Sequence, residues 1–300
     1  MNALEFENIC LKIGSRQILD NISFSVKKGM IYGLIGHNGA GKTSLLRILL
    51  GLTVGFNGKI RILSDDDLNK QRIHIGAVMD SLSIDMSLSA EKYIHRVNAL
   101  LGIDSPSEEK KHLERVGLTN TGKMPVSKFS LGMKRRLMIA GALIGSPDIL
   151  VLDEPFNGID PEGMAAIRLV LQQLSAEGVT VLVTSHNIPE LIKLSTAFGV
   201  MHKGSFVDSI TSDELAAKYV CKTVFKTNNP QLLMNQLTER LGAMDCFANS
   251  PGEISVFGEL DDEQCSRLSA DITEAKILNI SKSRMSEEEF LLWRMNGYTG

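Results

Sequence analysis

The sequence predicts an α/β protein in which a first part built on a parallel sheet is followed by a small α+β domain. Three apolar runs, at 30–35, 149–152 and 179–183, have the composition of strands buried on both faces, and each precedes a helical stretch. A glycine-rich loop joins the first run to its helix. Beyond residue 220, short strand and helix patterns alternate and the chain becomes more acidic. With 300 residues, 43% of them hydrophobic, the chain can form a core for one large or two modest domains.

Composition excludes several classes of protein. The net charge of −3 argues against a protein that mainly coats nucleic acid, because such binding depends on neutralising phosphates. No apolar run approaches the ~20 residues that span a bilayer, and the N-terminus lacks a signal-peptide pattern. The cysteines form no Cys-x-x-Cys pair, so we expect a cytosolic protein with reduced, mostly buried thiols at Cys10, Cys221, Cys246 and Cys265.

The elements of residues 1–220 follow in order. Short strands are expected in the first ~30 residues, and the buried strand 30–35 leads through the glycine-rich loop into a helix over 43–50 that ends at Gly51. Residues 88–145 are mostly helical in pattern, with starts at 89, 106 and 130. After the strands 149–152 and 179–183, a hairpin over 198–208 is expected to turn at Lys203-Gly204.

The last part of the chain differs in charge and pattern. Residues 221–300 contain 8 Lys/Arg and 12 Asp/Glu, a net charge of −4, whereas residues 1–220 sum to +1. Strands are expected at 223–226, 254–257 and 276–280, and helices at 230–241, 261–270 and 286–294. We therefore divide the chain into a domain over 1–220 and an accessory α+β domain over 221–300.

The glycine-rich loop matches G-x-x-x-x-G-K-[ST] and has the preceding strand and following helix that phosphate binding requires. Its glycines let backbone N–H groups approach a polyphosphate, and the helix N-terminus adds partial positive charge. Lys42 would reach the β- and γ-phosphates, and the Thr43 hydroxyl would bind Mg²⁺. The predicted nucleotide-binding residues of the loop are Gly36, His37, Asn38, Gly39, Ala40, Gly41, Lys42, Thr43 and Ser44.

Two other strands end in residues suited to chemistry. The run 149–152 ends in Asp153 and Glu154, where Asp153 would hold the Mg²⁺ shell and Glu154 would polarise an attacking water as general base. His186 follows the strand at 179–185, and ligand chemistry in open α/β sheets occurs at this edge. A solvated loop for the two carboxylates and a structural role for the histidine are the alternatives.

Five segments, in order and spacing, resemble the motifs of an ABC transporter ATP-binding subunit. They are 36–43 (Walker A), 129–137 (signature), 149–155 (Walker B), 157–161 (D-loop) and 184–186 (switch histidine). The resemblance covers about 1–220 and implies an ATPase domain with a parallel-sheet core, an antiparallel β subdomain and a helical subdomain. It also implies a head-to-tail dimer in which Ser130 and Gly132 meet the γ-phosphate bound by the partner. Arg136, farther along the same helix, is expected on a solvated face.

Three departures narrow the resemblance. The signature reads Phe-Ser-Leu-Gly-Met from residue 129, similar to the bacitracin-resistance and lantibiotic-immunity branch of ABC exporters. Asp80 stands where the family places a glutamine near Mg²⁺, and we expect it to be a metal ligand of shorter reach. Ile13 stands where many members stack an aromatic ring on adenine, so we expect weaker ATP binding through Ile13.

The resemblance predicts an ATP-hydrolysing subunit that drives export of a peptide antibiotic or hydrophobic drug through a separate transmembrane permease. ATP and Mg²⁺ are the expected cofactors, a homodimer is the expected assembly, and the cytoplasmic face of the membrane is the expected location. The permease contact is expected near Asp80 and the segment 81–93, where the apolar residues fit docking or core packing equally well: Met79, Leu82, Ile84, Met86 and Leu88.

Two rival interpretations remain. A soluble ABC-type ATPase acting on ribosomes or DNA is disfavoured by the acidic charge and by the presence of one such domain rather than two. A weakly active regulatory subunit is favoured by Ile13 and Asp80. The intact set Lys42, Asp153, Glu154 and His186 argues against it.

Overall fold

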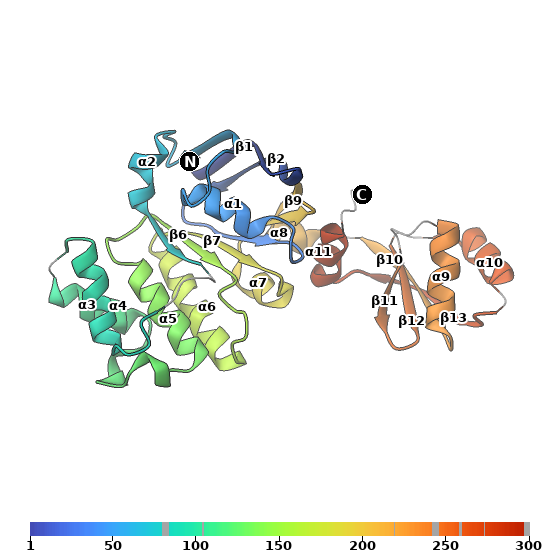
Figure 1. The fold of residues 1–300 in the computed structure, drawn as a ribbon. Helices are drawn as coiled ribbons and strands as arrows, with labels where there is room; N and C mark the ends of the chain where they lie inside the picture. The colour runs from blue at the N-terminus through green and yellow to red at the C-terminus, as the bar shows by residue number, and fades with distance from the viewer. Residues whose placement is uncertain are drawn as a thin grey trace. The chain divides into compact units, whose positions relative to one another are not determined.

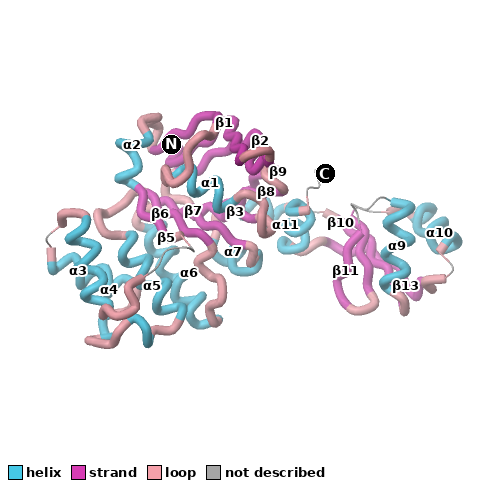
Figure 2. The backbone as a smooth tube through the Cα atoms, viewed as in Figure 1, coloured by secondary structure: helices cyan, strands magenta, loops and turns pink. Residues whose placement is uncertain are grey.

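The computed structural model describes residues 1–79, 84–103, 105–218, 220–241, 246–257, 260–272 and 274–296 (Figure 1). The chain divides into two compact units, Met1–Asp213 and Glu214–Gly300, and each has its own hydrophobic core. Within the described ranges no helix is long and apolar enough to cross a membrane. Figure 2 shows how strands and helices alternate through the first unit.

The first unit begins with a three-stranded antiparallel sheet in the order β2-β1-β4. Its strands are β1 (Asn2–Ile13), β2 (Arg16–Lys27) and β4 (Asn57–Ile62). The two long strands exceed the short ones predicted here. The register of β1 shifts between Phe6 and Ile9, beside Asn8 at φ 51°, so the apolar alternation changes phase and is hard to see in the sequence.

A six-stranded sheet forms the centre of the unit, in the order β5-β6-β7-β3-β8-β9. All neighbouring strands are parallel except β8 and β9, which form the predicted hairpin through Lys203 (φ 44°) and Gly204 (φ 87°). Every residue of β3, β6 and β7 is buried, as their apolar sequences predicted. The strands are β3 (Ile31–Ile35), β5 (Ile75–Val78), β6 (Ile149–Asp153), β7 (Thr180–Ser185), β8 (Ala197–His202) and β9 (Ser205–Thr211).

Helices lie on both sides of this sheet. In Figure 1, α1 and the antiparallel strands lie on one side of β6 and β7, and α5 and α6 on the other. Ser89 and Ser130 cap α3 and α5 through side-chain hydrogen bonds, which explains the predicted helix starts. The helices are α1 (Lys42–Leu49), α2 (Leu68–Gln71), α3 (Ala90–Leu100), α4 (Pro106–Arg115), α5 (Leu131–Ala142), α6 (Pro161–Ala176) and α7 (Ile188–Leu194), with 3₁₀ turns at Arg72–His74, Thr119–Thr121 and Val126–Lys128.

Arg136 corrects one expectation. It does not lie on a solvated face, because its guanidinium donates to the Val116 carbonyl at 2.7 Å. That carbonyl belongs to the C-terminal end of α4, where helical carbonyls lack intrahelical partners. Burial accordingly lowers the pKa of Arg136. Arg136 therefore contributes to the packing of α5 against α4, whereas the sequence pattern predicted that it faces solvent.

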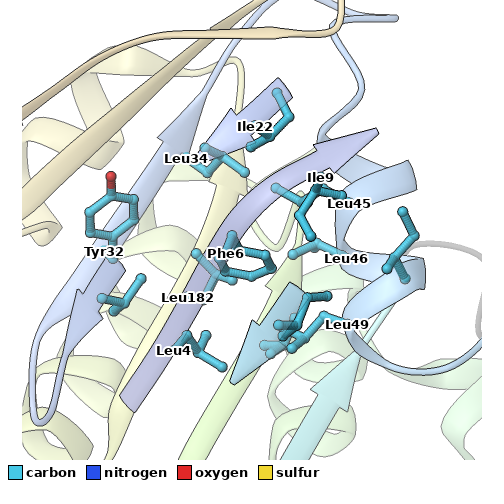
Figure 3. Close-up of a cluster of buried hydrophobic side chains, with 14 of the residues drawn as sticks. Leu4, Phe6, Ile9, Ile22, Tyr32, Leu34, Leu45, Leu46, Leu49 and Leu182 are labelled. Carbon is cyan, nitrogen blue, oxygen red and sulfur yellow. The ribbon is translucent and has the colours of Figure 1, made fainter. Parts of the chain in front are cut away.

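The hydrophobic core of the first unit joins the antiparallel sheet to α1 and the central sheet. Leu45, Leu46 and Leu49 on α1 are all fully buried. Figure 3 shows them in one cluster with side chains from β1, β2, β3 and β7: Leu4, Phe6, Ile9, Ile22, Tyr32, Leu34 and Leu182. This packing fixes α1, and with it the residues at its N-terminus, relative to the ends of the central strands.

The second unit contains a four-stranded antiparallel sheet in the order β11-β12-β10-β13. With the chain order β-α-β-β-α-β this is a split βαβ arrangement. Helices α9 and α10 lie on one side of the sheet and α11 on the other (Figure 1). Helix α8 (Ser212–Ala217) begins in the first unit and ends in the second. The other elements of the second unit are β10 (Cys221–Thr227), α9 (Pro230–Leu241), β11 (Cys246–Ser250), β12 (Glu253–Phe257), α10 (Asp262–Asp271), β13 (Ile277–Arg284) and α11 (Glu287–Met295).

Two predictions for the second unit were incomplete. Strand β11 was missed because its sequence, Cys-Phe-Ala-Asn-Ser, contains one residue typical of strands and no sustained alternation. The four cysteines were expected to be mostly buried, but each is half-buried.

Candidate functional site

The loop between β3 and α1 closes tightly only because glycine occupies two of its positions. A Cβ on Gly36 would lie 2.7 Å from the Met201 carbonyl oxygen. Gly41 has φ 102°, and a Cβ there would lie 2.6 Å from Leu19 Cδ2. A side chain at either position would push the loop away from β2 and β8, so the fixed glycines of the motif have a steric cause.

Lys42, the first residue of α1, is held against the loop by its side-chain contacts. Its residue is 5% exposed, and its Nζ donates to the Gly36 carbonyl at 2.5 Å and lies 3.4 Å from Glu154 Oε1. The loop therefore presents a buried cation that pairs with an acidic residue from the end of β6.

Oxygen atoms converge beside the lysine. Thr43 Oγ1 donates to the Asp153 carboxylate at 3.0 and 3.2 Å, and Asp153 is 2% exposed. A hydroxyl and a carboxylate are ligands that suit Mg²⁺, which also keeps several waters or phosphate oxygens. Among the described residues no three His, Cys, Asp or Glu side chains are grouped to hold a metal alone. A cation at Thr43 and Asp153 would thus share its ligands with a bound phosphate or water.

Glu154 and His186 complete the arrangement. Glu154 follows β6 with φ 49°, a left-handed conformation that L-residues rarely adopt. Its Oε2 lies 2.9 Å from His186 Nδ1, while its other oxygen faces Lys42. The ends of β6 and β7 therefore bring together the carboxylate and the imidazole that the sequence analysis singled out.

These groups line a cleft of about 410 Å³ in the first unit. Two of its lining residues, Arg16 and Ile18 on β2, were missed by the sequence analysis. The available signal was their spacing: Arg16 and Ile18 are two residues apart, and alternate residues of a strand lie on the same face. The whole lining consists of Arg16, Ile18, residues 37–44, Asp153, Glu154, Asn157 and His186.

Four of the predicted residues that the structure describes do not line this cleft: Gly36, at the start of the phosphate loop, and Ile13, Ser130 and Gly132. Ile13, at the end of β1, is 60% exposed. Ser130 is engaged as the N-cap of α5, accepting from the Met133 N–H at 3.2 Å. A Cβ on Gly132 would lie 3.2 Å from Gly163 Cα, so α5 packs closely on α6. The signature segment thus lies beside the start of α6 rather than over the phosphate loop of its own chain.

The expected permease contact is described only in part. Asp80, Ser81, Leu82 and Ser83 lie outside the described residues, so the role predicted for Asp80 stays a prediction. Of the neighbouring apolar residues, Met79 and Ile84 are buried, while Met86 is 46% exposed.

Comparison with known proteins places the chain in a family. Residues 19–157 match the family model described as ABC transporter. The chain is 39% identical over 208 residues to the lantibiotic transport ATP-binding protein SrtF of Streptococcus pyogenes, a match covering 68% of this chain and 89% of the relative. It is 34% identical over 295 residues to the bacitracin transport ATP-binding protein BcrA of Bacillus licheniformis, covering 95% of each.

The fold agrees with solved structures. A nucleotide-free ATP-binding cassette from an ABC transporter aligns with a TM-score of 0.65 at 22% identity, over 72% of this chain and 94% of that one. At this identity the likeness concerns the fold, and the predicted fold class is confirmed. The full-length match to a bacitracin transport protein and the phosphate-loop cleft lead to one conclusion: the chain belongs to the ABC transporter family, as an ATP-binding subunit with ATPase activity.

Proposed function

We propose that this chain hydrolyses Mg²⁺-ATP in a dimer of ATP-binding units and thereby powers export of a peptide antibiotic by a separate transmembrane permease. The observation that carries the proposal is the end of β6, where Asp153 holds Thr43 while Glu154 contacts Lys42 and His186. The cargo class is supported by relatives named for lantibiotic and bacitracin transport, one of which matches over 95% of this chain.

We assign a role to each group of the cleft. Thr43 Oγ1 and the Asp153 carboxylate would hold a Mg²⁺ ion, which supplies charge neutralisation at the β- and γ-phosphates. Lys42 would turn from Glu154 to the γ-phosphate, because an anion of higher charge competes for the same ammonium. Asp80 remains a proposed additional metal ligand.

Glu154 acts as the general base once Lys42 has turned away. A carboxylate must reach the water whose proton it accepts, and His186 Nδ1, 2.9 Å from Oε2, keeps the carboxylate oriented toward the cleft. Lys42 stabilises the charge that develops on the phosphate during attack.

The dimer would supply what the cleft of one chain lacks. Ser130 and Gly132 lie at the N-terminus of α5 and do not line the cleft of their own chain, which fits a role against a nucleotide held by a second copy. We assign ATP binding to residues 1–220 and an accessory role to 221–300, and we place the protein at the cytoplasmic face of the membrane, bound to its permease.

The experiment is a deletion strain complemented with variants, tested for sensitivity to bacitracin and to lantibiotics. Wild type and Glu177→Gln should restore resistance, since Glu177 pairs with Arg115 outside the cleft. Glu154→Gln should not, and its ATP turnover should fall by about 10²–10⁴. If deletion leaves sensitivity to every such peptide unchanged, the proposed cargo is wrong. If purified Glu154→Gln turns over ATP like wild type, the proposed catalytic role is wrong.

A further inference from the structure

We infer that Thr184 is a positioning residue for ATP hydrolysis, because its one hydroxyl fixes the geometry of both carboxylates at the end of β6. The inference deepens the function proposed above and rests on it.

The contacts of Thr184 are unusually concentrated. It stands on β7 opposite Asp153 in the parallel register of β6 and β7, and it is fully buried. Its Oγ1 donates to Asp153 Oδ1 at 2.7 Å and accepts from the Glu154 N–H at 3.1 Å. The Thr184 carbonyl accepts from the same N–H at 3.1 Å. One residue therefore holds the side chain of Asp153 and the backbone of Glu154.

The hydrogen bond from Thr184 to Asp153 matters because the hydroxyl of Thr43, which also donates to Asp153, is a proposed Mg²⁺ ligand. Asp153 accepts from two hydroxyls, Thr43 and Thr184. When Mg²⁺ and a nucleotide bind, the Thr43 hydroxyl would turn from Asp153 toward the metal ion. The bond from Thr184 to Oδ1 would then keep the Asp153 carboxylate in place and leave its remaining lone pairs available to a metal ion, as outer hydrogen bonds orient metal ligands elsewhere.

The bond to Glu154 fixes a strained turn. Glu154 adopts φ 49°, and such conformations persist only where surrounding contacts determine them. Its N–H is held by both acceptors of Thr184, and from this turn its side chain reaches Lys42 and His186. Without the Thr184 hydroxyl, the Glu154 N–H keeps only its hydrogen bond to the Thr184 carbonyl. The Glu154 carboxylate is then oriented less firmly.

Thr180 provides a matched control on the same strand. It is 1% exposed, and its Oγ1 accepts from the Gly29 N–H at 3.0 Å, at the opposite end of β7. Thr180→Val and Thr184→Val thus remove the same group from the same strand at equal burial. A merely structural role for Thr184 predicts equal consequences for the two variants.

The test uses the full-length chain and four variants: Thr184→Val, Thr184→Ser, Thr184→Cys and Thr180→Val. We expect Thr184→Val to lower kcat by about 10- to 100-fold, to raise the Mg²⁺ concentration for half-maximal turnover, and to leave KM for ATP within about threefold. Mn²⁺ binding in the presence of ADP, followed by electron paramagnetic resonance, should weaken in parallel. Thr184→Ser should restore both properties, because it restores the hydroxyl.

Thr180→Val should lower the melting temperature without changing the Mg²⁺ requirement. If Thr184→Val does not fold, Thr184→Cys replaces it, since a thiol is a weak donor. The inference would be overturned if Thr184→Val, or Thr184→Cys in its place, kept the wild-type kcat and Mg²⁺ dependence. It would also be overturned if Thr180→Val lost as much kcat and Mg²⁺ affinity as Thr184→Val. Loss of turnover in Glu154→Gln alongside an unaffected Thr184→Val would remove this inference and leave the proposed function standing.

Discussion

Arg16 and Ile13 lie opposite each other at the end of the first hairpin, but only Arg16 lines the proposed nucleotide cleft. Within the described part of the chain, the Arg16 guanidinium makes no hydrogen bond or ion pair. A guanidinium stacks on aromatic planes, and Ile18 beside it offers an apolar surface. We therefore expect the base of a bound nucleotide to rest against Arg16 and Ile18, rather than against Ile13 as the resemblance of the sequence motifs implied.

A pair of substitutions separates these two positions. Arg16→Ala should weaken ATP binding about three- to fivefold, the equivalent of an exposed cation–π contact. Ile13→Ala and Ile13→Tyr should leave it nearly unchanged. Titration calorimetry with ATP and with GTP at constant salt measures the dissociation constants. A loss of affinity in Ile13→Ala together with a gain in Ile13→Tyr, with Arg16→Ala unchanged, would return the base to Ile13.

At the scale of elements, helix α11 is held to its sheet by a half-buried ion pair. The Lys222 ammonium pairs with the Glu289 carboxylate, whose other oxygen accepts from the Ser286 N–H at 2.8 Å. Burial raises the pKa of Glu289, but the hydrogen bonds from Lys222 and Ser286 outweigh it and hold the pKa below its ordinary value. A depressed carboxyl pKa stabilises the fold above the unfolded-state pKa, about 4.3, and this contribution is lost as the pH falls through the folded-state value.

Glu289→Gln should therefore lower the free energy of unfolding of the second unit by about 2 kcal/mol at pH 7, since a charged hydrogen bond is lost. The difference from wild type should shrink between pH 5 and pH 3. Urea unfolding followed by the fluorescence of Trp293 on α11 measures it. Glu288→Gln is the matched control, because Glu288 is exposed on the same helix. Equal effects of the two variants would contradict the assigned pair.

The sequence predicted those elements whose patterns are local. Strands β3, β6 and β7 are continuous apolar runs, and the serine caps of α3 and α5 mark the helix starts. Features that depend on register were not predictable. The contact of Thr184 with Asp153 requires β6 and β7 to pair 31 residues apart, and the shift near Asn8 hides the alternation of β1.

The same distinction holds for the site. The sequence predicted Lys42, Thr43, Asp153, Glu154 and His186, which line one cleft, because each stands next to a strand or helix end that the sequence marks. Their convergence follows from the shared edge of a parallel sheet. Arg16 was missed because its place in the cleft depends on how the β1–β2 hairpin folds, and no local pattern encodes that.

At the scale of the whole molecule, the proposed ligand-binding cleft and the tryptophan lie in different units. The residues lining the proposed nucleotide cleft all lie within Met1–Asp213. The single tryptophan of the chain, Trp293, lies in Glu214–Gly300, where it packs on Phe257 at 5.1 Å and Phe290 at 5.9 Å between ring centroids. Each unit has its own core, so each can unfold in its own transition.

A nucleotide should consequently stabilise one transition and not the other. ADP with Mg²⁺ at 100 times its dissociation constant should add about 2.7 kcal/mol to the unfolding free energy of the first unit, because it binds only the folded state. Urea titrations followed by circular dichroism should show a transition that moves to higher urea, while Trp293 fluorescence excited at about 295 nm keeps its midpoint. Lys42→Ala, which removes the ammonium that we propose binds phosphate, should abolish the shift. A Trp293 midpoint that moves together with the circular dichroism would mean instead that the two units unfold as one.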